Sequence, residues 1–420
     1  MFIEQIINSH LNKYPRIKRV IKRIYQRLLS VVPHKSKVFG AVSKISPNDG
    51  FEYFFGYYDK TPWDASGRYM LCLRVKNTWV QPDSSETAEI VMFDTAENNT
   101  MYLLGTTNTW NVQQGCMLQW MGPDYSSRII YNDIRDNQYC SIILNIATKE
   151  ERIIKMPVYS VSADGNLAVS LDFSRLHSLR PGYGYMNLPD VTKGVALPKG
   201  YAVWRINILT GEIDGILRYS DFASFMPRPE MKAEGTIHKV NHLMLSPNGK
   251  RFIVLYRWFN NDRKYTRLIT CNIDGSDMYL LSDDDMVSHC FWKNDNEIIA
   301  FERKKVEGNG YYLMKDKTNF YKRLWPEIND DGHPSYSPKN KNIVLTDSYP
   351  NGRRFSTIRL MQEDKSTIDT IVKVYNPFKY DNETRCDLHP RWSRNGEMIC
   401  FDACFEGHRG LYVVNINNEE

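Results

Sequence analysis

The sequence of 420 residues is 42% hydrophobic, 13% aromatic and 25% charged, which is typical of a globular chain with one large domain or two modest ones. Because the mean hydropathy is −0.49 and no uncharged apolar run approaches about 18 residues, we expect no transmembrane helix. The net charge is +5, yet residues 1–40 alone carry +8, from nine basic residues and one acid. The remainder carries −3, so a nucleic-acid-binding surface across the body is excluded.

Residues 1–35 predict a basic amphipathic helix that precedes a body formed by residues 36–420. Pro15 opens the helical pattern and Pro33 ends it, and apolar residues follow the spacing of one helix face: Ile17, Val20, Ile21, Ile24 and Leu28. Basic residues fill the opposite side: Arg16, Arg19, Lys22, Arg23 and Arg27. Such a helix lies flat on an anionic membrane, so residues 13–31 predict membrane contact. The alternative is a helix packed on the body with a solvated basic face.

The eight cysteines show neither a Cys-x-x-Cys pair nor the regular spacing of a disulfide scaffold. Most lie within strand-like apolar runs, which predicts buried free thiols in a reducing compartment. The N-terminus does not resemble a signal peptide, because basic residues interrupt its apolar segment and no small-residue cleavage site follows. We therefore expect a cytoplasmic protein, peripheral at the inner face of a membrane through its terminal helix.

A short phrase recurs seven times from about residue 50 onward. It consists of a cluster ending in an aromatic or apolar residue, then Ser-x-x-Gly or a variant, then a β-rich run. A clear copy is His333-Pro-Ser-Tyr-Ser-Pro-Lys-Asn340, and the seven copies begin at residues 60, 117, 158, 242, 289, 333 and 389. The gaps are 41 to 57 residues, except for one of 84 between 158 and 242. These gaps match four-stranded propeller blades, roughly 40–50 residues each, with one long insertion.

Each copy predicts an innermost strand, a tight turn and a second strand, such as Met398–Phe401. The last copy has room for three strands only, the third at Leu411–Ile416. Lys37–Ile45 is then the candidate for the missing fourth strand, because a closed ring leaves no exposed edge. We therefore predict an all-β fold, a seven-bladed β-propeller with an N-terminal amphipathic helix. The alternative, a pair of β-sandwiches, would not produce seven copies in register.

Four of the nine histidines, His242, His289, His333 and His389, begin four consecutive copies of the phrase. In a propeller this position is the start of the innermost strand, so the four imidazoles would ring one mouth of the central channel. Converging neutral imidazoles suit a divalent transition metal, with Zn, Mn, Fe and Ni all open. Asp387 adds a carboxylate on the same strand face, as a ligand or as hydrogen-bonded support. The alternative is that each histidine caps a turn through a backbone hydrogen bond.

The long insertion contains a loop rich in aromatic residues, His177-Ser-Leu-Arg-Pro-Gly-Tyr-Gly-Tyr185. Loops at a propeller mouth are where substrate contacts are expected. Aromatic rings stack on pyranose faces and a guanidinium pairs bidentately with a carboxylate, so the loop predicts binding of an acidic sugar. His177 and Arg180 are its candidate catalytic residues. A hydrolase with paired carboxylates is the alternative, drawn from Asp59, Asp172, Asp347 and Asp402.

The His-Pro-x-x-Ser-Pro-type phrases and the segment Arg385-Cys-Asp-Leu-His-Pro-Arg-Trp-Ser393 resemble TolB-like propeller repeats and, more closely, oligogalacturonate lyases, over about residues 50–417. The resemblance implies a seven-bladed fold with a manganese ion held at the channel mouth by three histidines and a glutamine. It also implies β-elimination from uronate oligosaccharides by a histidine base and an arginine. Asp387 and Thr384 stand where that family has a histidine and the glutamine.

Carried over by position, the resemblance assigns His389 and either His333 or His289 to the metal, His242 to the base and Arg180 to the arginine. It therefore implies a metal-dependent lyase acting on an acidic oligosaccharide or polysaccharide. A second function stays open because the basic helix suits a membrane-associated protein. Such a protein would modify or bind a glycan in the biosynthesis of a surface polysaccharide of the capsule or O-antigen type. A third is a non-catalytic interaction propeller in which the histidines only cap turns.

Overall fold

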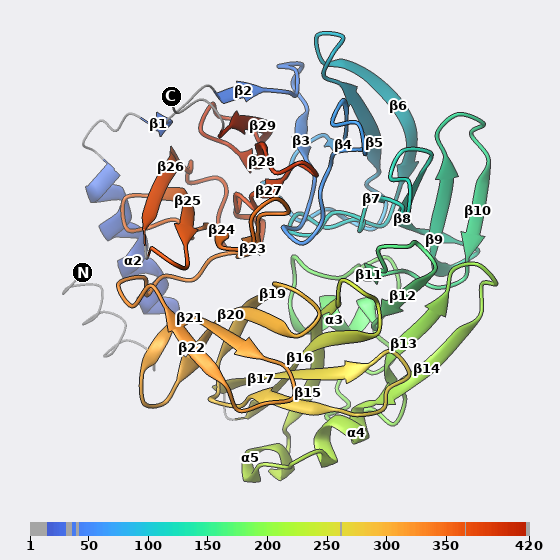
Figure 1. Ribbon diagram of the computed structural model, residues 1–420, viewed down its shortest axis with the longest axis vertical. Helices are drawn as coiled ribbons and strands as arrows, with labels where there is room; N and C mark the ends of the chain where they lie inside the picture. Colours follow the sequence, from blue (N-terminus) through green and yellow to red (C-terminus); the bar gives the residue numbers. More distant parts are fainter. Residues whose placement is uncertain (1–14, 31–35, 39–41, 261–262, 366, 417–420) are drawn as a thin grey trace.

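Seven antiparallel sheets surround a central axis in this computed structural model, which describes residues 15–30, 36–38, 42–260, 263–365 and 367–416 (Figure 1). The fold is the seven-bladed β-propeller that the repeated phrase predicts. The alternative of paired β-sandwiches is wrong, because the sheets follow one another around a ring.

Each of the first four blades is a four-stranded antiparallel sheet whose first strand lies nearest the axis. Blade 1 contains β3 Glu52–Phe54, β4 Tyr69–Val75, β5 Ala88–Asp94 and β6 Thr100–Thr107. Blade 2 contains β7 Gln119–Trp120, β8 Arg128–Arg135, β9 Gln138–Asn145 and β10 Glu151–Ile154. Blade 3 contains β11 Ser160–Val161, β12 Leu167–Ser170, β13 Tyr201–Asn207 and β14 Ile213–Arg218. Blade 4 contains β15 Ile237–Leu245, β16 Arg251–Asn260, β17 Arg263–Asn272 and β18 Tyr279–Ser282.

The last three blades complete the ring with strands from both ends of the chain. Blade 5 contains β19 Val287–Trp292, β20 Glu297–Lys304, β21 Gly308–Lys315 and β22 Tyr321–Leu324. Blade 6 contains β23 Ser335–Tyr336, β24 Ile343–Asp347, β25 Phe355–Gln362 and β26 Ile368–Tyr375, with β1 Lys37–Val38 as a fifth strand. Blade 7 contains β27 Arg391–Trp392, β28 Met398–Ala403, β29 Gly410–Asn415 and β2 Val42–Lys44.

The ring is closed by β2, the outermost strand of blade 7, which pairs Val42 with Val414 and Lys44 with Tyr412. This confirms the predicted closing strand for its second half. The first half behaves differently, since Lys37 pairs with Lys373 on the edge of blade 6. The segment therefore covers the open edges of two neighbouring blades, where unpaired backbone groups would otherwise remain.

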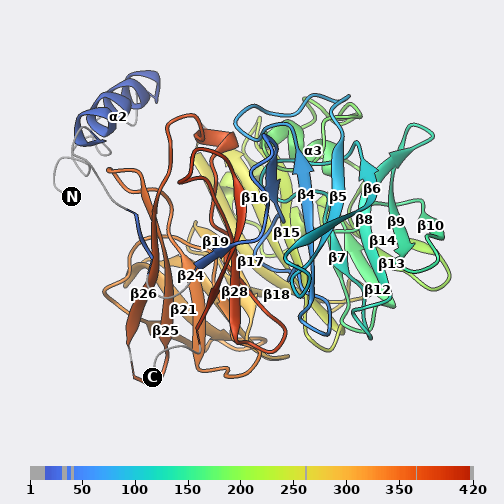
Figure 2. The same cartoon turned by 90° about the horizontal axis from the view of Figure 1, so that it is seen from above.

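Helices α2 (Pro15–Ser30) and α3 (Phe173–Leu179) lie at the same end of the propeller (Figure 2). The α3 helix belongs to the long insertion between β12 and β13, and α4 Tyr219–Ser224, α5 Pro229–Lys232 and the 3-10 helix η1 Asn382–Thr384 occupy other connections. The predicted N-terminal helix is observed from Pro15 to Ser30. Residues 13, 14 and 31 of the predicted membrane-contacting stretch lie outside the described residues. No helix in the described part of the chain is both long and apolar enough to cross a membrane.

The hydrophobic core lies between neighbouring blades, so the middle strands are buried on both faces. One cluster joins blade 1 to blades 2 and 7, and it includes Cys72 and Cys400. All eight cysteines are buried free thiols, as the apolar runs around them predict.

Candidate functional site

The four histidines at the start of the phrases lie at one end of the central channel, which we call the histidine mouth. His242 lies on β15 and His289 on β19, while His333 and His389 lie two residues before β23 and β27. All four are buried. The ring centroids of His289 and His333 are 4.1 Å apart, and those of His333 and His389 are 4.3 Å apart. The register of the repeat therefore brings three imidazoles into direct contact.

Two adjacent tyrosines after β3 fill the space between these histidines. The ring of Tyr57 lies 5.1 Å from that of His389, and the ring of Tyr58 is stacked on His242 at 6.1 Å. Tyr58 also donates a 2.8 Å hydrogen bond from its hydroxyl to the carbonyl of Cys290. Burial raises the pKa of both phenols well above the usual value, so both remain neutral. His242 is separated by Tyr58 from the other three imidazoles.

Three buried side chains, those of His333, Asp387 and His389, place potential ligand atoms within 4.8 Å of one another. The Asp347 carboxylate orients two of them. It accepts a 2.8 Å bond from Nδ1 of His333 and a 3.1 Å bond from the backbone N–H of His389. Because Nδ1 of His333 donates to that carboxylate, its Nε2 presents a lone pair, which is the arrangement found around metal-bound histidines.

The nitrogen atoms that face this group have no hydrogen-bond partner among the described residues. They are Nε2 of His333 and both ring nitrogens of His389. His389 also has φ of 41°, a left-handed conformation that non-glycine residues rarely adopt and that tends to occur at functional sites. A buried imidazole without a partner is costly, and a metal ion would satisfy these nitrogens. The donor set of two imidazoles and a carboxylate therefore fits a divalent metal.

The electrostatic environment distinguishes the three adjacent histidines. Burial lowers the pKa of His389 well below its usual value, and the nearby His333 lowers it further. Burial lowers the pKa of His289 to about 4, although Asp331 opposes this with a 3.0 Å contact to Nδ1. For His333 burial also acts against the charge, but Asp347 outweighs it and raises the pKa. Asp347 thus favours positive charge at His333, and a metal ion at Nε2 would take the place of the proton.

A cavity of about 390 Å³ opens beside the histidines. Tyr349 lines it and lies 5.7 Å from the ring of His333. Arg385 also lines it and forms 2.8 Å contacts with both carboxylate oxygens of Asp387. The remaining lining side chains include Gln26, Arg180, Arg257, Lys264, Ser288, Asp331 and Arg354. The candidate metal ligands therefore lie next to the walls of a cavity that can hold a small molecule.

Four cationic side chains in or beside this cavity form no ion pair with any described residue: Arg180, Lys239, Arg257 and Lys264. Arg257 lowers the pKa of Lys264 to about 7, and burial and Arg180 add to the effect. Burial likewise lowers the pKa of Arg257 to about 10 and that of Lys239 well below its usual value. Repulsion among uncompensated cations of this kind favours an anionic ligand.

The three predicted catalytic residues occupy different surroundings. Arg180, at the end of α3, lines the cavity and stacks on the ring of Tyr183 at 4.1 Å. His242 is buried beneath the tyrosine pair, where burial lowers its pKa to about 3 and its Nε2 has no partner among the described residues. His177 lies on α3 and donates a 3.2 Å bond from Nδ1 to the Tyr183 carbonyl. The fold thus brings only Arg180 into the lining of the cavity, and the catalytic roles stay predictions.

The predicted metal ligands also separate into two groups. His333, His389 and Asp387 form the compact set, while His289 lies beside His333 but turns Nδ1 to Asp331. None of the four imidazoles donates to a backbone carbonyl within the described residues, so the capping alternative has no hydrogen bond to support it.

The carboxylates considered for a hydrolase are engaged at separate places. Asp402 is paired with Arg391 and Arg409, Asp347 with His333, and Asp172 caps the start of α3. Asp59 is paired with Lys60. None of these contacts brings two of the four carboxylates together, so the described structure offers no acid–base pair from this set.

Several residues of the cavity were missed by reasoning from the sequence. Arg257 interrupts the apolar run of β16, and Lys239 interrupts that of β15, and both are buried. A charge inside an apolar strand is a detectable signal, because burying it is costly unless a partner or ligand compensates. Lys264 and Asp331 carry no such signal, since they lie in polar stretches of the sequence.

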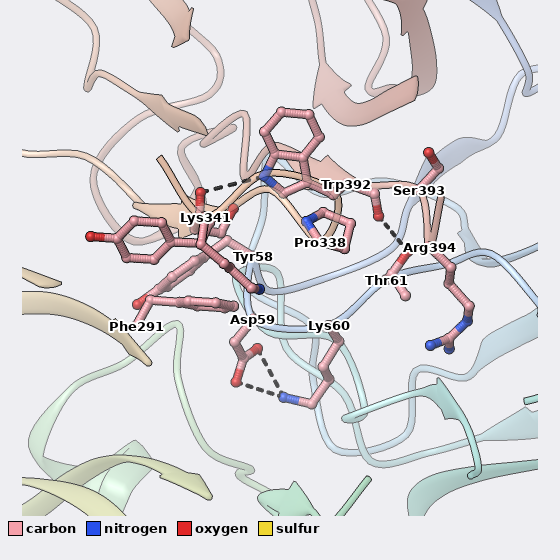
Figure 3. Close-up of a pocket in the computed structure, with 12 residues that line it drawn as sticks. Tyr58, Asp59, Lys60, Thr61, Phe291, Pro338, Lys341, Trp392, Ser393 and Arg394 are labelled. Atoms are coloured by element: carbon pink, nitrogen blue, oxygen red, sulfur yellow. Dashed lines mark hydrogen bonds and ion pairs between the residues drawn. The ribbon is translucent and has the colours of Figure 1, made fainter. Parts of the chain in front are cut away.

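The opposite end of the channel, which we call the turn mouth, holds two smaller cavities of about 260 and 220 Å³. They share Asp59, Lys60, Thr61 and Arg394. Figure 3 shows Nζ of Lys60 turned to both carboxylate oxygens of Asp59, at 2.9 and 3.0 Å. The indole N–H of Trp392 and the hydroxyl of Thr61 also donate to protein carbonyls here. Lys60, Trp392 and Thr61 are therefore paired at the turn mouth, whereas Arg394 and Lys341, which also line it, form no ion pair with a described residue.

Comparison with known proteins shows the fold. No family model and no curated protein sequence matches the chain. It is similar to the solved structure of an oligogalacturonate lyase from Vibrio parahaemolyticus, with a TM-score of 0.61 and 13% identity over 91% of this chain and 96% of that one. It is similar to an oligogalacturonate lyase in complex with manganese, with a TM-score of 0.64 and 14% identity over 92% of this chain and 97% of that one.

The propeller domain of the Trilobed protease from Pyrococcus furiosus is a more distant likeness, with a TM-score of 0.52 and 10% identity over 89% of this chain and 95% of that one. At these identities the likenesses concern the fold alone. The resemblance to oligogalacturonate lyase propellers inferred from the repeated phrase is confirmed at that level.

Proposed function

We propose that the protein is a metal-dependent lyase that cleaves uronate-containing oligosaccharides by β-elimination. The observation that supports this most is the position of unpartnered imidazole nitrogens, on His333 and His389, next to a cavity with unpaired cations. A uronate matches both features, because it carries a carboxylate for the cations and an acidic C5–H beside it. The manganese complex of one similar lyase supports manganese as the metal.

His333, Asp387 and His389 would hold the metal. A divalent cation bound there supplies Lewis-acid stabilisation of the negative charge that develops on the substrate carboxylate. Asp347 fixes the orientation of His333, so the ligating nitrogen is positioned before the metal arrives. Manganese accepts a mixed set of imidazole and carboxylate ligands.

Arg180 and Arg257 would bind the uronate carboxylate. Neither guanidinium has an ion-pair partner among the described residues, so a substrate carboxylate would not have to displace one. Charge-assisted bonds to an arginine strengthen as negative charge builds on the carboxylate in the transition state. Binding of this kind lowers the pKa of the C5 proton and prepares it for removal.

Lys264 is the better candidate for accepting that proton. It lines the cavity, and its pKa near 7 leaves a large neutral fraction at physiological pH. His242 is neutral as well, but it lies beneath the tyrosine pair and its pKa of about 3 makes it a weak base. In the reaction the C5–H electron pair forms the C4=C5 double bond, the C4–O bond breaks, and the leaving oxygen takes up a proton.

Incubation of the purified chain with manganese and a panel of uronate oligomers tests the proposal. The unsaturated uronate product absorbs in the ultraviolet, so absorbance should rise with time and stop rising when a chelator is added. A matched panel of neutral oligosaccharides should give no signal. If no uronate oligomer gives a rise although the protein contains metal, the lyase reaction is wrong.

A second function is favoured by the N-terminal helix, which exposes apolar side chains. We propose it as the alternative: a membrane-associated protein that binds or modifies an acidic surface glycan without elimination. Saturable binding of acidic oligosaccharides with no new absorbance would support this alternative. A protein with neither metal nor glycan binding would instead be an interaction propeller.

A further inference from the structure

Helix α2 turns an apolar stripe to solvent. Ile17, Val20, Ile24 and Leu28 follow one another at intervals of three or four residues, which places them on one face of the helix. Their exposed fractions are 52%, 58%, 55% and 68%, although each is a large aliphatic side chain. Among the described residues all four side chains stay more than half exposed, so they form an apolar face rather than scattered surface residues.

Another side of α2 contacts the propeller at the histidine mouth. Arg23 forms a 2.8 Å ion pair with Asp381, and its guanidinium lies 5.5 Å from the ring centroid of Phe378. Gln26 is 4% exposed and belongs to the lining of the cavity that contains Arg180 and Lys264. Figure 2 shows α2 at the end of the propeller that also carries α3. Helix α2 therefore contributes Gln26 to the cavity wall on one side and faces solvent on the other.

The charge of α2 indicates which kind of partner can cover its apolar face. The sixteen residues of the helix include six that are basic and none that is acidic, the basic ones being Arg16, Lys18, Arg19, Lys22, Arg23 and Arg27. A second copy of the same helix would bring like charges together. An anionic lipid surface instead accepts the apolar side chains at the acyl boundary and the basic groups among its headgroups.

We propose that α2 binds an anionic lipid bilayer through Ile17, Val20, Ile24 and Leu28 and thereby holds the cationic cavity of the histidine mouth at the membrane surface. Because Gln26 on another face of the same helix lines that cavity, the membrane and the cavity are brought close by one element. The turn mouth then faces away from the bilayer. This orientation holds whichever reaction the cavity performs, and its test needs no activity.

Sedimentation of the full chain with lipid vesicles tests the binding. Vesicles of phosphatidylcholine mixed with phosphatidylglycerol should sediment the protein, and vesicles of phosphatidylcholine alone should sediment far less. The double variant Ile24→Glu/Leu28→Glu should reduce partitioning of the protein onto the anionic vesicles at least about tenfold. Each substitution removes an apolar side chain that would be buried in the bilayer and adds a negative charge that the lipid headgroups repel. Leu209→Glu is the matched control, since Leu209 is 62% exposed in the β13–β14 turn, at the other end of the blades.

Two outcomes of that experiment overturn the proposal. One is equal sedimentation of the wild-type chain and the Ile24→Glu/Leu28→Glu variant. The other is a wild-type chain that does not bind vesicles but forms a dimer, when the Ile24→Glu/Leu28→Glu variant is a monomer. That result would assign the apolar face to contact with a second copy of the chain. Circular dichroism and thermal unfolding of each variant show that the propeller is folded, and the exposure of the substituted residues leads us to expect no change.

Site-specific labelling tests the orientation. All eight native cysteines are buried, so a fluorescent thiol reagent should react with one introduced surface cysteine. Glu383→Cys places it in η1, next to cavity-lining Asn382, and Leu209→Cys places it at the other end of the blades. On anionic vesicles that contain a headgroup quencher, the label at 383 should lose most of its fluorescence and the label at 209 little. Equal quenching, or stronger quenching at 209, overturns the orientation.

Discussion

The two mouths of the channel differ in the size of their cavities and in how far their buried polar groups are paired. At the histidine mouth, Arg257 and Lys264 have no ion-pair partner among the described residues, and both ring nitrogens of His389 are unpartnered. At the turn mouth, Lys60 is neutralised by Asp59, and Arg394, which has no ion pair with a described residue, donates instead to the carbonyl of Trp63. Among the described residues that line the turn mouth, the buried group without a hydrogen-bond partner is the hydroxyl of Ser335, which is neutral.

The unpartnered imidazole nitrogens, more than cavity volume, are the reason why we propose the histidine mouth as the reactive site. A buried charge or imidazole without a partner lowers the stability of the folded protein, so it persists where a ligand or metal compensates. Perturbed pKa values concentrate at such places, as at Arg257 and His389. At the turn mouth the buried ammonium of Lys60 is paired, and the described residues that line its cavities include no imidazole.

The largest expected effect follows from removing two candidate metal ligands. The double variant His333→Ala/His389→Ala should lose bound manganese and reduce lyase activity to background, because only the Asp387 carboxylate would remain. Metal content by mass spectrometry and the uronate absorbance assay measure both. His408→Ala, which removes an exposed imidazole, is the control and should change neither. Unchanged metal content in the double variant would show that the histidine mouth is not a metal site.

Removing the proposed base should have the next largest effect. Lys264→Met should lower kcat by about 10²- to 10⁴-fold while metal content is retained, because a positioned base contributes about this much. In the wild-type protein, activity should fall as the pH drops below about 7, where Lys264 becomes protonated. His242→Gln should have a smaller effect on kcat. A large loss in His242→Gln together with normal activity in Lys264→Met would return the role of base to His242.

A smaller effect with a distinct pH signature is expected for Arg257→Gln. Arg257 is the main cause of the lowered pKa of Lys264, so its removal raises that pKa and moves the acidic limb of the pH–rate profile to higher pH. Activity at pH 7 should fall about tenfold for each unit of the shift and recover partly at alkaline pH. Arg263→Gln changes a residue next to Lys264 on β17 whose side chain is 60% exposed, and it should leave the profile unchanged. A uniform loss at every pH would mean that Arg257 only binds substrate.

The repeat made much of the fold predictable. The seven phrases predict the blades and their second strands, for example Met398–Phe401 against the observed β28 Met398–Ala403. The open edge of the last blade predicts β2 as the closing strand, and the periodicity from Pro15 predicts α2. These features follow from local patterns that repeat or from the need to cover an edge.

The candidate site was predictable only for residues whose positions follow from the register of the repeated phrase. His333, His389 and Asp387 meet because the innermost strands begin at equivalent places around one axis. Arg257 and Lys264 belong to the second and third strands of blade 4, and their approach to Arg180 depends on how the long insertion folds back over the mouth. No local pattern encodes that approach. The same limit applies to the Tyr57–Tyr58 pair, whose position between the histidines follows from the path of the chain after β3.

The smallest effect on activity is expected at the turn mouth, where Asp59→Asn should leave metal content and kcat within about twofold of the wild type. Stability should change instead, because the side chain of Lys60 is only 7% exposed and Asp59 is its counter-ion. Loss of a hydrogen bond to a charged group costs about 1.5–3 kcal/mol, so the melting temperature should fall.

The double variant Asp59→Asn/Lys60→Met separates a structural pair from a functional one. Removing both charges should recover much of the lost stability, because no unpaired ammonium group then remains at the mouth. Thermal unfolding of the wild type, both single variants and the double variant measures the coupling between the two side chains. If Asp59→Asn instead lowers activity in a protein of unchanged melting temperature, the pair takes part in the reaction. The Asp59–Lys60 pair would then no longer distinguish the turn mouth from the histidine mouth.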